Sequence, residues 1–181
     1  GRIVAIFFVF KSLHGVLMRV FILILVLVPF YAPAALFGVD WGESIDKYGE
    51  LTKLNDYYRV VTNSVPEPLS IAKNYELVQK ADNGLVKILM TSYEYSAFSD
   101  SFQSDYVEIQ DYLINNGYET REFRQSELSS YQCILQGECV GMLWIGVNHD
   151  QSVVVLEQIM NGRERSFIQL EVKSNTFITS N

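Results

Sequence analysis

Three strand-like runs near the C-terminus constrain the fold of this chain most strongly. They cover residues 140–148, 153–160 and 166–174, and short polar turns separate them. In the last run, apolar and polar side chains alternate: Ile168, Leu170 and Val172 with Gln169, Glu171 and Lys173. Alternation puts the two sets on opposite faces of a strand, so it predicts a sheet with one buried and one solvated face. That arrangement is typical of antiparallel sheets.

The clearest hairpin and the clearest helix lie in the middle of the chain. Residues 75–81 and 85–93 flank the turn Asp82-Asn83-Gly84, and an Asn-Gly pair favours the positive φ angles of a tight hairpin. Residues 100–116 repeat apolar side chains at the spacing of one helical stripe. The stripe consists of Phe102, Tyr106, Ile109 and Leu113.

Shorter segments complete the expected fold. Residues 55–62 are aromatic and β-branched and predict a strand, while 44–51 and 126–135 predict short helices. Loops are short, and the βαβα alternation of parallel sheets is missing from the sequence. We therefore expect an α+β fold, an antiparallel sheet of about five to six strands with about two to three helices packed on one face.

The N-terminal region has the pattern of a secretory leader. Arg19 precedes an uninterrupted apolar run over 20–30, and small residues follow. A charged start, a short apolar core and a small-x-small site favour a signal peptide. The pattern predicts cleavage between Ala34 and Ala35 and a translation start near Met18.

The leader decides the expected domain organisation and location. We predict a leader over 1–34 and a single globular α+β domain over 35–181, in the periplasm or secreted. The alternative is a retained N-terminal inner-membrane anchor, because the apolar run over 20–37 approaches the roughly 20 residues that span a bilayer. With the leader cleaved, we expect no membrane attachment.

The charge balance limits the classes of partner. The chain carries 14 basic and 21 acidic residues, and the leader holds basic residues but no acid, so the remainder is strongly acidic. Such a surface disfavours nucleic acid, whose phosphates need Lys and Arg, and it disfavours anionic membrane. It suits a basic protein partner through electrostatic steering, although ordinary solubility explains the same charge.

Cys133 and Cys139 are the only two cysteines, with five residues between them. In an oxidising compartment such a pair predicts a disulfide, and five residues can bend enough to bring the Cα atoms to about 5.5 Å. A zinc site would need more ligands, and a redox pair would typically be spaced Cys-x-x-Cys. The disulfide is therefore the favoured interpretation.

Catalytic signatures are missing from the sequence. We find no nucleophile elbow, phosphate loop or zinc-protease motif, and the acidic residues are too scattered to pick out a glycosidase pair. His149 is the only histidine after the leader, and beside Asp150 it is a candidate general base. Turn-forming neighbours favour an exposed loop histidine instead. We expect no enzyme activity, no cofactor and no metal.

The segment Tyr93–Asp100 resembles an interface most closely. It mixes aromatic and acidic side chains directly before the long helix, and tyrosine gives large contact area at low entropic cost. The candidate interface residues are Tyr93, Glu94, Tyr95, Phe98 and Asp100. The alternative is an ordinary strand end, with Tyr93 and Tyr95 on one inward face.

The region after the leader resembles a family of small secreted bacterial proteins of unknown function. Residues 37–44, Phe-Gly-Val-Asp-Trp-Gly-Glu-Ser, are similar to the family's FGxxWG(M)S opening. The loop over 65–69, the strand over 85–88 and the cysteine pair are similar too. More loosely, the order of elements resembles the α+β modules of outer-membrane-assembly lipoproteins and β-lactamase inhibitor proteins. No functional residue follows from either resemblance.

Together these observations favour a non-enzymatic, periplasmic protein-binding module, inhibitor-like or immunity-like. The first alternative is an accessory protein of envelope assembly or maintenance, which a retained anchor would favour. The second is a hydrolase of envelope polymers that uses His149. The sequence leaves the oligomeric state open.

Overall fold

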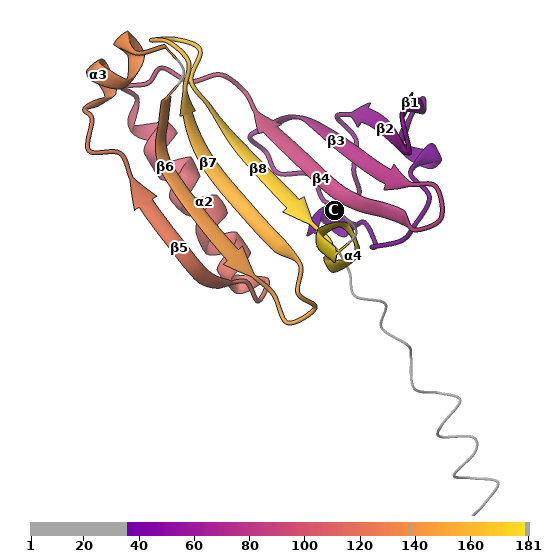
Figure 1. The fold of residues 1–181 in the computed structure, drawn as a ribbon. Coiled ribbons are helices and arrows are strands. Elements are labelled where there is room, and N and C mark those ends of the chain that lie inside the picture. Colours follow the sequence, from indigo (N-terminus) through magenta and orange to yellow (C-terminus); the bar gives the residue numbers. More distant parts are fainter. Residues whose placement is uncertain (1–35, 138, 180–181) are drawn as a thin grey trace, which may run out of the picture. The chain divides into compact units, whose positions relative to one another are not determined.

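The computed structural model of the chain describes residues 36–137 and 139–179, and the predicted leader with its cleavage site at Ala34 and Ala35 lies outside them. The described residues form one antiparallel sheet of eight strands in the order β1-β2-β3-β4-β8-β7-β6-β5 (Figure 1). The strands are β1 (Thr52–Leu54), β2 (Tyr57–Thr62), β3 (Ala72–Lys80), β4 (Gly84–Ser92), β5 (Glu119–Gln125), β6 (Cys139–Val147), β7 (Val153–Met160) and β8 (Phe167–Lys173).

Two meanders joined by one crossover produce this order. Strands β1 to β4 pair each with the next, and the helix α2 (Asp100–Asn115) then carries the chain to the far edge of the sheet. Strands β5 to β8 return from that edge, so that β8 pairs with β4 and the two meanders become one sheet. Antiparallel pairing is favoured where short turns connect successive strands, as between β3 and β4 and between β6 and β7.

The predicted α+β fold with five to six strands is wrong. The described residues contain eight strands and only three α-helices, α2, α3 (Ser130–Leu135) and α4 (Asn175–Thr179), so the fold is dominated by its sheet. β5 could not be found from the sequence, because this strand is rich in charge and all of its residues are exposed. The helix expected over 44–51 is a single 3-10 turn, Asp46–Tyr48.

Several elements are confirmed. The hairpin is β3 and β4, and Gly84 in its turn adopts the positive φ of 63° that Asn-Gly turns favour. The long helix is α2, with Ser99 as its N-cap. The three C-terminal runs are β6, β7 and β8.

One face of the sheet carries the core. α2 lies against this face over β6 to β8 (Figure 1), and its stripe of Phe102, Tyr106, Ile109 and Leu113 is buried. Two hydrogen bonds fix the helix to β7. The Tyr106 hydroxyl donates to the Leu156 carbonyl at 3.3 Å, and the side-chain amide of Gln158 donates to the Phe102 carbonyl at 3.1 Å. Burial of these side chains is the main source of stability.

The opposite face carries ion pairs among half-buried apolar side chains. Glu171 of β8 bonds to Lys173 at 2.6 Å and to Lys87 of β4. α4 covers one corner of this face, where the Phe177 and Tyr57 rings lie 5.9 Å apart. On this face, most side chains of β5 to β7 are half-buried or exposed within the described residues, and we call it the open face.

Candidate functional site

The predicted interface residues lie on the segment that connects β4 to α2. Tyr93 and Phe98 are large and exposed, at 58% and 53% of their surface. Glu94 and Asp100 are exposed as well, while Tyr95 is half-buried. The structure therefore separates the two tyrosines, one outward and one inward, which neither sequence interpretation anticipated.

Backbone hydrogen bonds hold this segment in place at several points. The Tyr93 amide donates to the Ile71 carbonyl at 3.0 Å, and Tyr95 exchanges two backbone bonds with Ser166 at 2.7 and 3.2 Å. The Ala97 amide donates to the Arg163 carbonyl at 2.7 Å. The exposed side chains of Tyr93 and Phe98 thus project from an ordered backbone, which lowers the entropic cost of using them in binding.

Tyr95 joins the segment to α2. Its ring stacks on Phe102 with centroids 5.3 Å apart, and its hydroxyl donates to the Asp105 carboxylate at 2.8 Å. Burial, and then the hydrogen bond to Asp105, raise the pKa of Tyr95 well above its ordinary value of 10.0. The phenol therefore stays protonated at physiological pH and keeps Asp105 oriented.

A small pocket of about 80 Å³ opens beside this contact. It lies between the loop before β3 and the middle of α2. Its lining residues are Leu69, Ser70, Ile71, Asp105, Glu108, Ile109 and Tyr112. Ile71 and Asp105 also bond to Tyr93 and Tyr95, so the pocket and the segment form one continuous surface. We call this surface, the segment Tyr93–Asp100 plus the pocket, the Tyr93 surface.

The pocket is lined by both apolar and acidic side chains. Leu69, Ile71 and Ile109 supply hydrocarbon, while Asp105 and Glu108 supply negative charge. Lys and Arg have this dual character, with an apolar stem and a cationic head. The pocket can therefore accept one basic side chain and hold its charge at the carboxylates.

The sequence pointed to the segment but missed the pocket. Leu69, Ser70 and Ile71 are more than thirty residues from Asp105 and Glu108 in the sequence, and only the pairing of β3 with β4 and the docking of α2 bring them together. On α2, Asp105 and Glu108 lie outside the buried stripe of the helix. Nothing local marked the loop as their neighbour.

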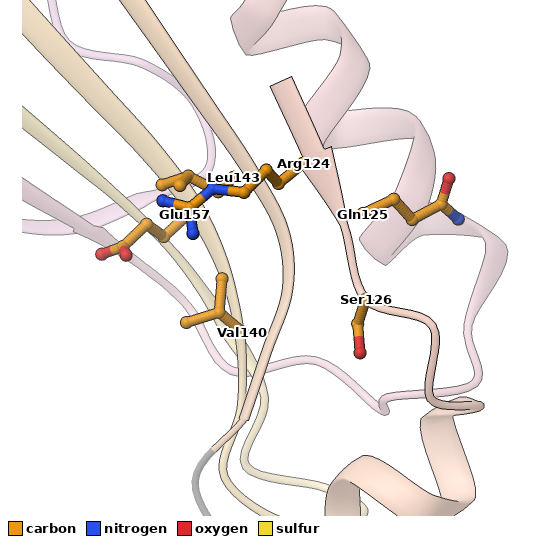
Figure 2. A pocket seen from close by; sticks show the side chains of 6 residues that line it. All are labelled: Arg124, Gln125, Ser126, Val140, Leu143 and Glu157. Atoms are coloured by element: carbon orange, nitrogen blue, oxygen red, sulfur yellow. The ribbon is translucent and has the colours of Figure 1, made fainter. Parts of the chain in front are cut away.

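A larger pocket of about 390 Å³ lies on the open face of the sheet near β5 (Figure 2). Its lining residues are Arg124, Gln125, Ser126, Val140, Leu143 and Glu157. Arg124 and Glu157 flank Leu143 on neighbouring strands, as the strand register requires. The Arg124 guanidinium is already paired with Glu122 at 2.6 Å, so the charge of this arginine is partly neutralised.

His149 lies exposed in the turn between β6 and β7. The neighbouring Asp150 directs its carboxylate to Ser152 instead, accepting from the amide at 2.8 Å and from the hydroxyl at 2.6 Å. Asp150 therefore supports the turn. Across residues 36–137 and 139–179, no group of three or more His, Cys, Asp or Glu is arranged to hold a metal ion. Within those same ranges, the helices are too short or too polar to cross a membrane.

Cys133 and Cys139 are paired in the structure, with their Cα atoms 5.3 Å apart. Cys133 lies in α3 and is fully buried, while Cys139 begins β6. The pair therefore ties a peripheral helix to the sheet.

Comparison of the chain with protein-family models, with curated proteins and with solved structures finds no match.

Proposed function

We propose that this protein is a non-enzymatic binding module of the periplasm, inhibitor-like or immunity-like, which recognises a basic protein through the Tyr93 surface. The observation that carries the proposal is the combination of exposed Tyr93 and Phe98 with an adjoining pocket that contains Asp105 and Glu108. Aromatic anchors beside complementary charge are the usual source of binding energy in protein interfaces.

The net charge of −7 supports a basic partner. Acidic and aromatic groups at one surface would steer such a partner and then bury apolar area with it. Arg163 lies at one end of the Tyr93 surface, because its carbonyl accepts from the Ala97 amide. Its side chain is paired with Glu164 at 3.3 Å and places a positive charge there. A partner with a single basic patch would fit the acidic part of the surface and keep its positive charges away from Arg163.

The test is affinity capture from the native cell envelope with a C-terminally tagged full chain, at low and at high salt. We expect one saturable, salt-sensitive partner. The Tyr93→Ala/Phe98→Ala variant should bind that partner at least roughly tenfold more weakly, as expected for central interface aromatics. Tyr131→Ala is the matched control, because Tyr131 is 63% exposed but belongs to α3.

The pocket is tested separately with Glu108→Gln. This change removes one charge and leaves the hydrogen bond between Tyr95 and Asp105 intact. We expect weaker binding and a smaller salt dependence, whereas Asp111→Asn, an equivalent change elsewhere on α2, should leave both unchanged. Equal capture by all variants would contradict the proposed surface, and no saturable partner would contradict the function.

The same tagged protein tests the location. We expect to recover the protein from the periplasmic fraction. Mass spectrometry of the purified chain should then show an N-terminus at Ala35. An uncleaved N-terminus in the membrane fraction would favour the anchored accessory protein instead.

A further inference from the structure

β5 is an outer strand that carries four charged residues and one β-bulge. It ends the sheet beside β6, and no other strand of the described residues pairs with its outer side. All of its residues are exposed, including Phe123 at 50% of its surface. The other outer strand, β1, is only Thr52–Leu54. An exposed edge of this length is a template for pairing with a further strand.

The order of charges along β5 is complementary to itself in one antiparallel register. The strand reads Glu-Thr-Arg-Glu-Phe-Arg-Gln. When two copies align so that Arg121 faces Glu122 of the second copy, Glu119 faces Arg124 and Thr120 faces Phe123. Every charged residue then meets an opposite charge, which stabilises a cross-strand pair. Shifting the alignment by one residue in either direction places like charges together, Glu122 against Glu122 or Arg121 against Arg121.

The bulge in β5 fits the same register. Thr120 pairs with Gly146 and Glu122 with Ile145, so Arg121 is the extra residue. Thr120 lies on the covered side of the sheet, where its hydroxyl accepts from the Trp144 indole at 3.0 Å, and Phe123 is paired with Trp144 on the same side. Glu119, Glu122 and Arg124 face the open side with Val147, Ile145 and Leu143 as their partners. The register therefore pairs Glu119 with Arg124 on the open side and Thr120 with Phe123 on the covered side.

We propose that β5 is a homodimer interface, in which two copies of this chain pair their β5 strands antiparallel and join their sheets into one. A twofold axis at the middle of the strand makes the interface self-complementary, as symmetric dimers require. This inference is independent of the proposed function, because β5 is on the second meander and the Tyr93 surface is at the end of the first.

Site-specific disulfide cross-linking of the full chain tests the register. Thr120→Cys and Phe123→Cys are prepared as single variants, mixed, and oxidised. Facing residues in an antiparallel pair have Cβ atoms about 4.5–5.5 Å apart, and a shift of the strands by less than about 1 Å brings them into the range of a disulfide. We expect the mixture to give a covalent band at twice the mass of the monomer, reversed by reductant. Neither single variant should give this band, because neither residue faces its own copy.

Charge reversal tests the complementarity in the same assay. Arg121→Glu, added to both cysteine variants, should abolish the cross-link because it opposes Glu122 with a like charge. The exchange Arg121→Glu/Glu122→Arg should restore it. Arg163→Glu is the control of equal charge change, since Arg163 is exposed and far from β5 in the sequence, and it should leave the cross-link intact. No cross-link in the mixture, or equal cross-linking of the single variants, would overturn the proposal.

Discussion

The two faces of the sheet are made from alternate residues of the same strands, yet they are built differently. On the side of the sheet that α2 covers, Val154, Leu156 and Trp144 are fully buried. On the open face, their neighbours Val155 and Ile145 are only half-buried and lie beside the ion pairs of Glu171. Burial of apolar side chains on the covered face therefore supplies most of the stability, and the open face contributes less.

The largest difference in stability should be seen between two equivalent substitutions, one on each face of the sheet. Val154→Ala and Val155→Ala remove the same atoms from adjacent positions of β7. We expect Val154→Ala to lower the free energy of unfolding by roughly 2–3 kcal/mol, through lost burial plus a cavity, and Val155→Ala by less than about 1 kcal/mol. Urea unfolding with an unchanged m value measures both. Equal losses would show that the open face is buried by something outside the described residues.

A strand could be predicted from the sequence when its own residues carried the pattern, and was missed when it depended on a neighbouring strand. In β8 the apolar and polar residues alternate, so both the strand and its buried face were visible locally. In β5 the strand exists because β6 pairs with it, and no apolar pattern of its own marked it. The fold class was wrong for this reason, since each missed strand made the protein seem less dominated by its sheet.

The candidate site shows the same division. The segment Tyr93–Asp100 was found because its aromatic and acidic residues are adjacent in sequence. The pocket beside it was not found, because its carboxylates come from α2 and its apolar wall from the loop before β3. Long-range contacts of this kind leave no local trace.

A smaller effect is expected from the ion pairs of the open face. Burial by itself would raise the pKa of Glu171, but hydrogen bonds from Lys173 and Lys87 outweigh it and hold the pKa below its ordinary value of 4.5. A lowered carboxyl pKa stabilises the folded state above the unfolded pKa, and that contribution is lost as the pH falls through the folded pKa. We expect Glu171→Gln to cost about 1–2 kcal/mol at neutral pH.

The pH dependence separates this charge effect from a packing effect. The difference in unfolding free energy between the native chain and Glu171→Gln should shrink below pH 4.5, as the native carboxylate takes up its proton. Glu164→Gln is the control, because its pair with Arg163 is far more exposed. If the difference in unfolding free energy stays constant down to acid pH, the loss in Glu171→Gln comes from altered packing and not from the lost charge.

The smallest effect should come from Arg59, also on the open face. Its guanidinium is 3.5 Å from the Glu76 carboxylate, with both side chains about a third exposed, so the pair is long and screened. Its buried Nε has no hydrogen-bond partner among the described residues, which is a cost of burying the side chain. Arg59→Met keeps the apolar stem and removes both features. We expect a change in unfolding free energy within about 0.5 kcal/mol, insensitive to salt. A loss comparable with that of Val154→Ala would mean that this face contributes to stability as the covered face does.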